Sequence, residues 1–233
     1  MASSKQNPNL DILLLATEQL GALLDEVVFL GGCATGLLLT DAAAPSVRVT
    51  KDVDVIVEVT SRSNYYQFEK KLRQQGFQSD TSSDVLCRWR GDGVILDVMP
   101  TDEKILGFAN DWYTPAIRAA KKITLLGGME INMVTASYFL ATKLEAFHGR
   151  GKGDYLLSHD IEDFVAVMDG RPEIEDEIKS AEYELRAYLK EEFTALLNTT
   201  AFVQALSGHL PPDFVSEQRV ATVKEKMKLI SML

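Results

Sequence analysis

The pattern of apolar and polar residues changes near residue 134. Up to that point, short runs of apolar and β-branched residues predict strands. The predicted strands cover residues 27–30, 53–59, 85–89, 94–99, 123–126 and 129–134. Longer segments with helical spacing predict helices at residues 10–24, 34–40 and 65–75. Paired glycines between neighbouring strands, at 91 and 93 and at 127 and 128, indicate two hairpins.

From residue 135 onward the pattern is helical throughout. It predicts helices at 135–147, 160–168 and 172–189, with further helices up to the C-terminus. Thr135 suits an N-cap and Pro172 suits a first helical turn. We therefore expect an α+β fold, with a mixed-sheet α/β core at residues 1–134. A C-terminal helical bundle at residues 135–233 is expected to complete a cleft.

Composition narrows the cellular setting. The chain has 233 residues, of which 46% are hydrophobic and 25% charged, as in globular proteins that are not embedded in membranes. No apolar run approaches the roughly 20 residues that span a bilayer, and the polar N-terminus does not resemble a signal peptide. The two cysteines form no CxxC pair. We therefore expect a cytoplasmic protein without a membrane partner.

The net charge of −10 argues against a surface that binds nucleic acid over its whole extent. Basic residues nevertheless cluster in two places, where an anionic ligand is expected. The clusters are Arg118, Lys121 and Lys122, and Lys143, Arg150 and Lys152.

Asp52 and Asp54 lie two residues apart at a predicted strand, so both side chains leave the same face. Their Cα atoms would be about 6.6 Å apart, a spacing that suits two metal ions about 3.5–4 Å from each other. Carboxylates are the oxygen ligands that Mg²⁺ prefers. The alternative is two solvated acids on the polar face of an edge strand.

Asp97 stands alone in the apolar run 94–99, where a carboxylate is costly unless it is paired or bound to a metal. If the strands are neighbours, Asp97 would complete the metal site and accept the proton of an attacking hydroxyl. The alternative is an acid on an edge strand. Gly31 and Gly32 join a strand to a helix, and the free backbone N–H groups of such a turn suit a phosphate.

Taken together, these segments resemble the nucleotidyltransferases of the DNA-polymerase-β superfamily. The resemblance lies in Gly31 and Gly32, in the stretch Arg48, Thr50, Asp52 and Asp54, and in Asp97 between Leu96 and Val98. Together with Lys143 and with Asp160 and Asp163 farther along, the form of the motif is similar to the AbiEii-type toxins. Those toxins belong to bacterial toxin–antitoxin and phage-defence systems.

The resemblance implies roles for individual residues. Asp52, Asp54 and Asp97 would be catalytic and bind two Mg²⁺ or Mn²⁺ ions, and Lys143 and Asp160 would also be catalytic. The residues implied to bind the nucleotide are Gly31, Gly32, Cys33, Arg48, Thr50 and Lys143.

Three features depart from the motif. Cys33 replaces a common serine after the glycines, and residues 41–46 lengthen the stretch before Asp52, which we interpret as an inserted surface loop. Ser158 and His159 replace the usual basic residue before Asp160. We interpret His159 as a capping or supporting residue, and 149–153 as an interhelical loop, with a basic lid as the alternative.

The expected function is metal-dependent transfer of a nucleoside monophosphate from an NTP to an acceptor hydroxyl. The family resemblance favours RNA or a tRNA end as acceptor, and an antitoxin protein as partner. Two alternatives stay open: a nucleotidyltransferase that modifies a small molecule such as an antibiotic, and a non-catalytic nucleotide-binding module. The acidic charge suits a cationic small molecule.

Overall fold

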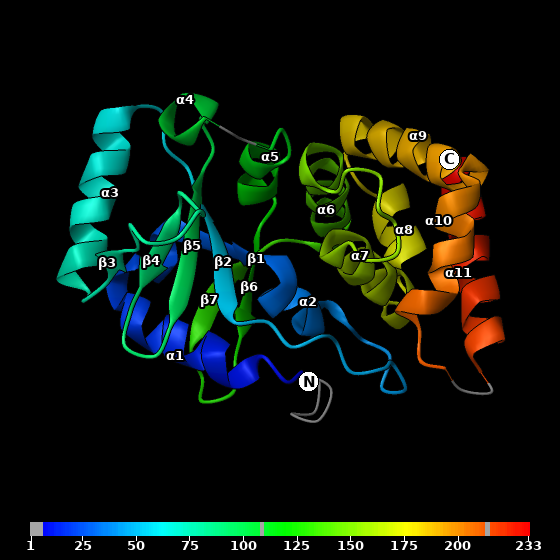
Figure 1. The fold of residues 1–233 in the computed structure, drawn as a ribbon, viewed down its shortest axis with the longest axis horizontal. Coiled ribbons are helices and arrows are strands. Elements are labelled where there is room, and N and C mark those ends of the chain that lie inside the picture. Colours follow the sequence, from blue (N-terminus) through cyan, green and yellow to red (C-terminus); the bar gives the residue numbers. More distant parts are fainter. Residues whose placement is uncertain (1–6, 108–109, 213–214) are drawn as a thin grey trace. The chain divides into compact units, whose positions relative to one another are not determined.

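The computed structural model describes residues 7–107, 110–212 and 215–233, and shows a mixed α/β fold with one seven-stranded mixed sheet (Figure 1). The chain divides into two compact units. Of the described residues, those within 8–34 and 48–135 form the sheet unit, and residue 7 together with those within 35–47 and 136–233 forms the helical unit. None of the described helices is both long and apolar enough to cross a membrane.

The sheet follows the order β3-β4-β5-β2-β1-β7-β6. Its strands are β1 (Val27–Leu30), β2 (Asp52–Val57), β3 (Gln78–Ser79), β4 (Arg88–Arg90), β5 (Ile95–Pro100), β6 (Lys121–Thr124) and β7 (Glu130–Met133). Both predicted hairpins are confirmed, since β4 pairs with β5 and β6 with β7 in antiparallel fashion. The predicted strand at 85–89 begins later, at Arg88.

The central strands β2 and β5 run parallel to each other, while β1 and β2 are antiparallel. Val53, Val55 and Leu96 are fully buried, so the apolar side chains of these strands fill the core. Because β2 and β5 both have a strand on either side, their acids do not lie on edge strands. The edge-strand alternative for Asp52, Asp54 and Asp97 was therefore wrong.

The sheet unit contains helices close to the predictions at 10–24 and 65–75, together with two short helices after β5 that were not predicted. They are α1 (Leu10–Leu20), the 3-10 helix η1 (Gly21–Glu26), α3 (Arg62–Gln74), α4 (Glu103–Leu106) and α5 (Tyr113–Arg118). The first helix ends sooner than predicted because Gly21 adopts φ +52°, a value that interrupts an α-helix. Leu13, Ala16 and Leu20 form its fully buried face.

Helix α2 (Gly31–Leu38) starts directly after β1, three residues before its predicted start. Segment 39–47 follows it in the helical unit and packs there on the C-terminal end of α7. The backbone N–H groups of Thr40 and Asp41 both donate to the carbonyl of Gly170. Only the tip of the segment is the surface loop that we expected, since Ala42 and Ala43 are exposed whereas Ala44 is buried.

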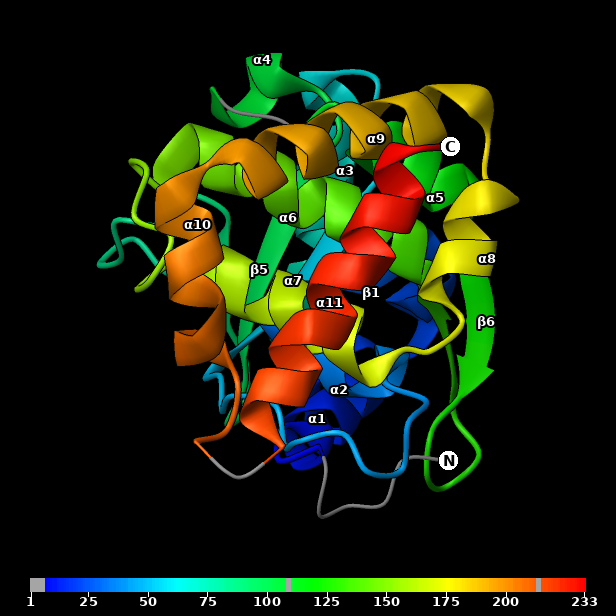
Figure 2. The ribbon, with the colours of Figure 1, turned by 90° about the vertical axis from the view of Figure 1, so that its right-hand side faces the viewer.

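The helical unit contains α6 (Ala136–Arg150), α7 (His159–Gly170), α8 (Ile174–Lys179), α9 (Tyr183–Asn198), α10 (Thr200–Ala205), η2 (Leu206–His209) and α11 (Ser216–Ser231). Helix α11 packs against α9 and α7, and α6 packs against α7 and α9 (Figure 2). The single helix predicted at 172–189 was wrong, because α8 and α9 are separate. Buried Ile178 and Leu185 are seven residues apart, which fits one continuous helix, so the apolar pattern did not reveal the break.

Candidate functional site

The register of the sheet brings three acids together in the sheet unit. Asp54 on β2 and Asp97 on β5 are partners in the parallel pair. Asp52 lies two residues before Asp54, and residues two apart on a strand point to the same face. Asp97 is buried, whereas Asp52 and Asp54 are partly exposed, so the group reaches the solvent. The three predicted metal ligands therefore share one face of two adjacent strands.

Arg88 on β4 joins two of these acids, and the sequence reasoning did not select it. Its Nε and Nη2 atoms donate to the two oxygens of Asp97 at 2.8 and 2.7 Å. Nη2 also lies 2.7 Å from Oδ2 of Asp52. The hydrogen bonds to Asp97 raise the pKa of Arg88 above its ordinary value. One signal was available in the sequence, because a hairpin closed at residues 91–93 sets Arg88 opposite Asp97.

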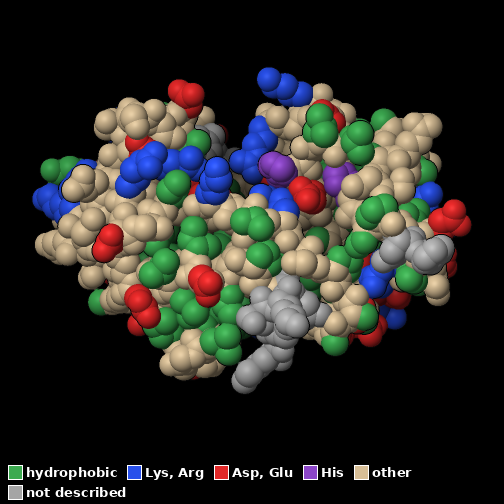
Figure 3. Space-filling model, turned by 60° about the horizontal axis from the view of Figure 1, so that its bottom comes forward, with side chains coloured by type: hydrophobic (Ala, Val, Ile, Leu, Met, Phe, Trp, Pro, Cys, Tyr) green, Lys and Arg blue, Asp and Glu red, His purple; other side chains and the backbone are tan. Residues whose placement is uncertain are grey.

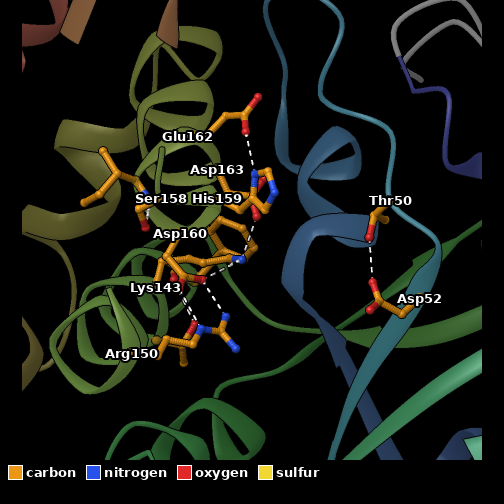
Figure 4. Close-up of polar contacts among 12 residues, drawn as sticks. Thr50, Asp52, Lys143, Arg150, Ser158, His159, Asp160, Glu162 and Asp163 are labelled. Carbon is orange, nitrogen blue, oxygen red and sulfur yellow. Dashed lines mark hydrogen bonds and ion pairs between the residues drawn. The ribbon is translucent and has the colours of Figure 1, made fainter. Parts of the chain in front are cut away.

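Asn9 holds the segment that leads into β2. Its side-chain amide donates to the carbonyl of Arg48 at 2.9 Å and accepts from the N–H of Thr50 at 3.0 Å. The hydroxyl of Thr50 in turn donates to Oδ1 of Asp52 at 2.6 Å (Figure 4). Asn9 is almost completely buried. Thr50 thus orients Asp52 in the structure, a position that the prediction had assigned to nucleotide binding.

Gly31 begins α2 at the position where β1 and β2 pair, since Leu30 is the register partner of Asp54. Gly31 adopts φ +73°, and a Cβ built there would overlap the carboxylate of Asp54. The close approach of backbone and carboxylate therefore requires glycine. Asp54 lies beside the start of a helix, where negative charge is favourable.

Both cysteines are buried in this unit. Burial, reinforced by the charges of Asp54 and Asp52, raises the pKa of the Cys33 thiol far above its usual value. Burial and the charges of Asp97 and Asp54 raise the pKa of Cys87 to about 12. The Cys33 thiol donates to the carbonyl of Asn9 at 3.7 Å. Cys33 was predicted to bind nucleotide, and in the structure its side chain packs inward.

The three carboxylates fit a divalent cation in the chemistry of their donors, because oxygen ligands suit Mg²⁺ and Mn²⁺. In the geometry present, Asp52 and Asp97 contact the guanidinium of Arg88. Within the described ranges, no three His, Cys, Asp or Glu side chains are already arranged to hold a metal ion. A metal ion would therefore have to share or replace the contacts of Arg88.

Lys143 and Asp160, the other two predicted catalytic residues, meet inside the helical unit. The Lys143 ammonium lies 2.6 Å from Asp163 and 3.3 Å from Asp160 (Figure 4). Arg150 donates twice to Asp160, at 2.8 Å each. Burial raises the pKa of Asp160, but the hydrogen bonds and charges of Arg150 and Lys143 outweigh it and hold that pKa below its usual range. The cluster joins α6 to α7.

The remaining candidates have local partners. Ser158 caps α7 by accepting from the N–H of Ile161, and exposed His159 contacts Glu162 one turn later. This geometry supports a capping role for Ser158 and a surface ion pair for His159. Arg150 ties the 149–153 segment to buried Asp160, which favours the interhelical-loop interpretation.

The two predicted basic clusters differ in exposure. Arg118, Lys121 and Lys122 are all exposed in the sheet unit, whereas Lys143 is buried. Figure 3 shows that Lys and Arg side chains reach the surface although the net charge is negative. Of the two clusters, the one at Arg118, Lys121 and Lys122 is therefore wholly exposed to an anionic ligand.

Comparisons with known proteins add little. No protein-family model matches the chain, and no curated protein matches it. Among solved structures, the chain is similar to JHP933 from Helicobacter pylori, with a TM-score of 0.47 and 12% sequence identity. That alignment covers 100% of this chain and 94% of JHP933. Similarity at this level does not assign an activity to the chain.

Proposed function

We propose that this protein is a metal-dependent nucleotidyltransferase that moves a nucleoside monophosphate from an NTP to an acceptor hydroxyl. The observation that carries the proposal is the register of β2 and β5, which makes Asp54 and Asp97 partners and sets Asp52 on the same face. Three carboxylates in the interior of a sheet are unfavourable without positive charge. A bound cation would stabilise the grouping in addition to the charge that Arg88 supplies to Asp52 and Asp97.

In this proposal Asp52, Asp54 and Asp97 bind two Mg²⁺ or Mn²⁺ ions. Such ions neutralise a triphosphate and activate a hydroxyl when they are bound. A bond forms between the acceptor oxygen and the α-phosphorus, and the bond from that phosphorus to the oxygen bridging to the β-phosphorus breaks. Pyrophosphate leaves, and the hydroxyl proton passes to the Asp97 carboxylate. Loss of a contact with Arg88 would make the Asp97 oxygen concerned a stronger proton acceptor.

The turn at Gly31 and Gly32 is the proposed phosphate site. Backbone N–H groups at the start of α2 are suited to an anion. The Cys33 thiol is directed toward Asn9, so the proposal uses the backbone of this turn and not the Cys33 side chain. Arg48 is included as a cation near the site because its charge acts on Cys33, which lies in that turn.

Lys143 and Asp160 are included among the proposed catalytic residues because of the family resemblance. Lys143 is buried and paired with two carboxylates, so contact with a triphosphate would require it to leave Asp163. Separating a buried ion pair is costly. The more direct role of both residues is to hold α6 and α7 together.

For the acceptor we propose RNA, such as a tRNA end, in a toxin-like activity that an antitoxin protein would restrain. The exposed cluster Arg118, Lys121 and Lys122 supports an anionic acceptor. A second candidate is a cationic small molecule, which the net charge of −10 favours.

The test is incubation with each labelled NTP and Mg²⁺, with total RNA, protein extract and aminoglycoside-type cations as separate acceptors. The Asp52→Asn/Asp54→Asn variant should transfer no label, whereas Asp92→Asn, in the exposed turn between β4 and β5, should transfer as the wild type does. The labelled acceptor identifies the substrate class. Metal-dependent NTP binding without transfer to any acceptor would favour a non-catalytic module, and absence of NTP binding would overturn the proposal.

A further inference from the structure

Arg88 forms hydrogen bonds to the same carboxylate oxygens that would bind the proposed metal ions. It contacts both oxygens of Asp97 and one oxygen of Asp52. The other oxygen of Asp52 accepts the hydroxyl of Thr50. Every oxygen of these two carboxylates therefore accepts a hydrogen bond in the structure.

The guanidinium also supplies charge that a metal ion would supply. Like charges that share a buried face repel each other unless a cation lies between them. The two-pronged contact with Asp97 is a strong, charge-assisted arrangement. The Arg88 side chain is 19% exposed, so it borders the solvent and has somewhere to move.

Arg90 is a second arginine on β4 and serves as a comparison with Arg88. It lies two residues from Arg88 on β4 and pairs with Asp80, with Nε and Oδ2 2.7 Å apart. Asp80 belongs to neither β2 nor β5. Arg90 is thus a matched arginine whose ion pair does not include a proposed metal ligand.

We propose that Arg88 is an internal competitor of the divalent cation. It neutralises Asp52 and Asp97 in the metal-free protein and releases them when metal binds. This inference rests on the proposed function, since it needs a metal site at these acids. Binding of metal and binding of Arg88 then weaken each other by the same factor. Arg88 therefore sets the metal concentration at which the site fills.

The test is calorimetric titration of the full-length protein with Mn²⁺ in the absence of nucleotide. We expect Arg88→Met to bind Mn²⁺ about tenfold more tightly than the wild type, because the charge-assisted contacts of Arg88 with Asp52 and Asp97 no longer have to break. Arg88→Lys should fall between them, since lysine keeps the charge but not the planar fork. Arg90→Met should match the wild type, and Asp52→Asn/Asp54→Asn should lose binding.

Thermal unfolding in EDTA and in Mn²⁺ gives a second measurement. Arg88→Met should be less stable than the wild type in EDTA, and should gain more from Mn²⁺. If Arg88→Met does not fold without metal, the thermal stability of Arg88→Lys in EDTA and in Mn²⁺ is compared with that of the wild type instead.

Equal Mn²⁺ affinity in Arg88→Met and the wild type, with binding lost in the double aspartate variant, would overturn the competition and leave the metal site standing. Weaker binding in Arg88→Met would also overturn it, because Arg88 would then help to build the site. If Asp52→Asn/Asp54→Asn binds Mn²⁺ as well as the wild type does, the proposed metal site at these acids would itself be wrong.

Discussion

Gly31 and Asp54 approach so closely that a methyl group on Gly31 would occupy the space of the Asp54 carboxylate. The contact joins the start of α2 to β2 and so couples the proposed phosphate turn to a proposed metal ligand. Gly31 also has φ +73°, in the left-handed region that disfavours side chains. Both backbone conformation and space therefore require glycine at this position.

Gly31→Ala should lower the free energy of unfolding more than Gly93→Ala does. Gly93 has φ +75° and nothing within 4 Å of a Cβ, so the substitution there adds only backbone strain of about 1–2 kcal/mol. Gly31→Ala adds displacement of Asp54 and should also weaken Mn²⁺ and NTP binding. Urea unfolding and calorimetry measure the two effects. Equal losses of unfolding free energy in Gly31→Ala and Gly93→Ala would contradict the close contact between Gly31 and Asp54.

Lys143→Met should destabilise the helical unit by about 3–5 kcal/mol, because the buried carboxylate of Asp163 would lose its 2.6 Å contact with the ammonium of Lys143. The double variant Lys143→Met/Asp163→Leu should recover part of this loss. The control Lys179→Met, at an exposed helical position, should change the unfolding free energy by less than about 0.5 kcal/mol. A higher KM for NTP without loss of stability would instead support contact of Lys143 with the triphosphate.

The lowered pKa of Asp160 predicts acid sensitivity of the helical unit. Burial raises this pKa, but Arg150 and Lys143 lower it by more than burial raises it. The pKa of Asp160 in the folded protein therefore lies below the ordinary 3.8. The resulting stability is fully present above the unfolded pKa and is lost as pH falls through the folded pKa. Asp160→Asn should therefore be less stable than the wild type at pH 7, with a difference that shrinks below about pH 4.

Urea unfolding of Asp160→Asn and of the wild type between pH 7 and pH 3 tests this prediction. Asp176→Asn, at an exposed position on α8, is the matched control and should follow the wild type throughout. A difference between Asp160→Asn and the wild type that stays constant down to pH 3 would contradict the assignment.

Cys33 and Cys87 should resist thiol reagents in the folded protein. Both are buried, and burial raises both pKa values, to about 12 for Cys87, so thiolate is scarce at pH 8. Reaction with a disulfide reagent should be slow in buffer and reach two thiols per chain in denaturant. Fast reaction of either thiol in the native protein would show that the packing around that cysteine opens.

Short-range features of this fold could be predicted from the sequence because they depend on neighbouring residues. The β-branched run at β2, the glycine turn between β4 and β5 and the strand at β1 were found with small shifts of their ends. The same-face placement of Asp52 and Asp54 follows from the period of two in any strand. The break between α8 and α9 was missed because the apolar spacing runs through it unchanged.

Outside the two hairpins, only the tertiary structure decided which strands are neighbours. The order of the sheet sets β5 beside β2, and that pairing brings Asp97 to Asp54 across 43 positions of the chain. The sheet order also brings Arg88 onto Asp52, whereas the packing of α6 on α7 buries Lys143 between Asp160 and Asp163. The sequence determined which chemical groups are present and which face of a strand they occupy. Their partners depend on long-range pairing and packing, which local patterns do not specify.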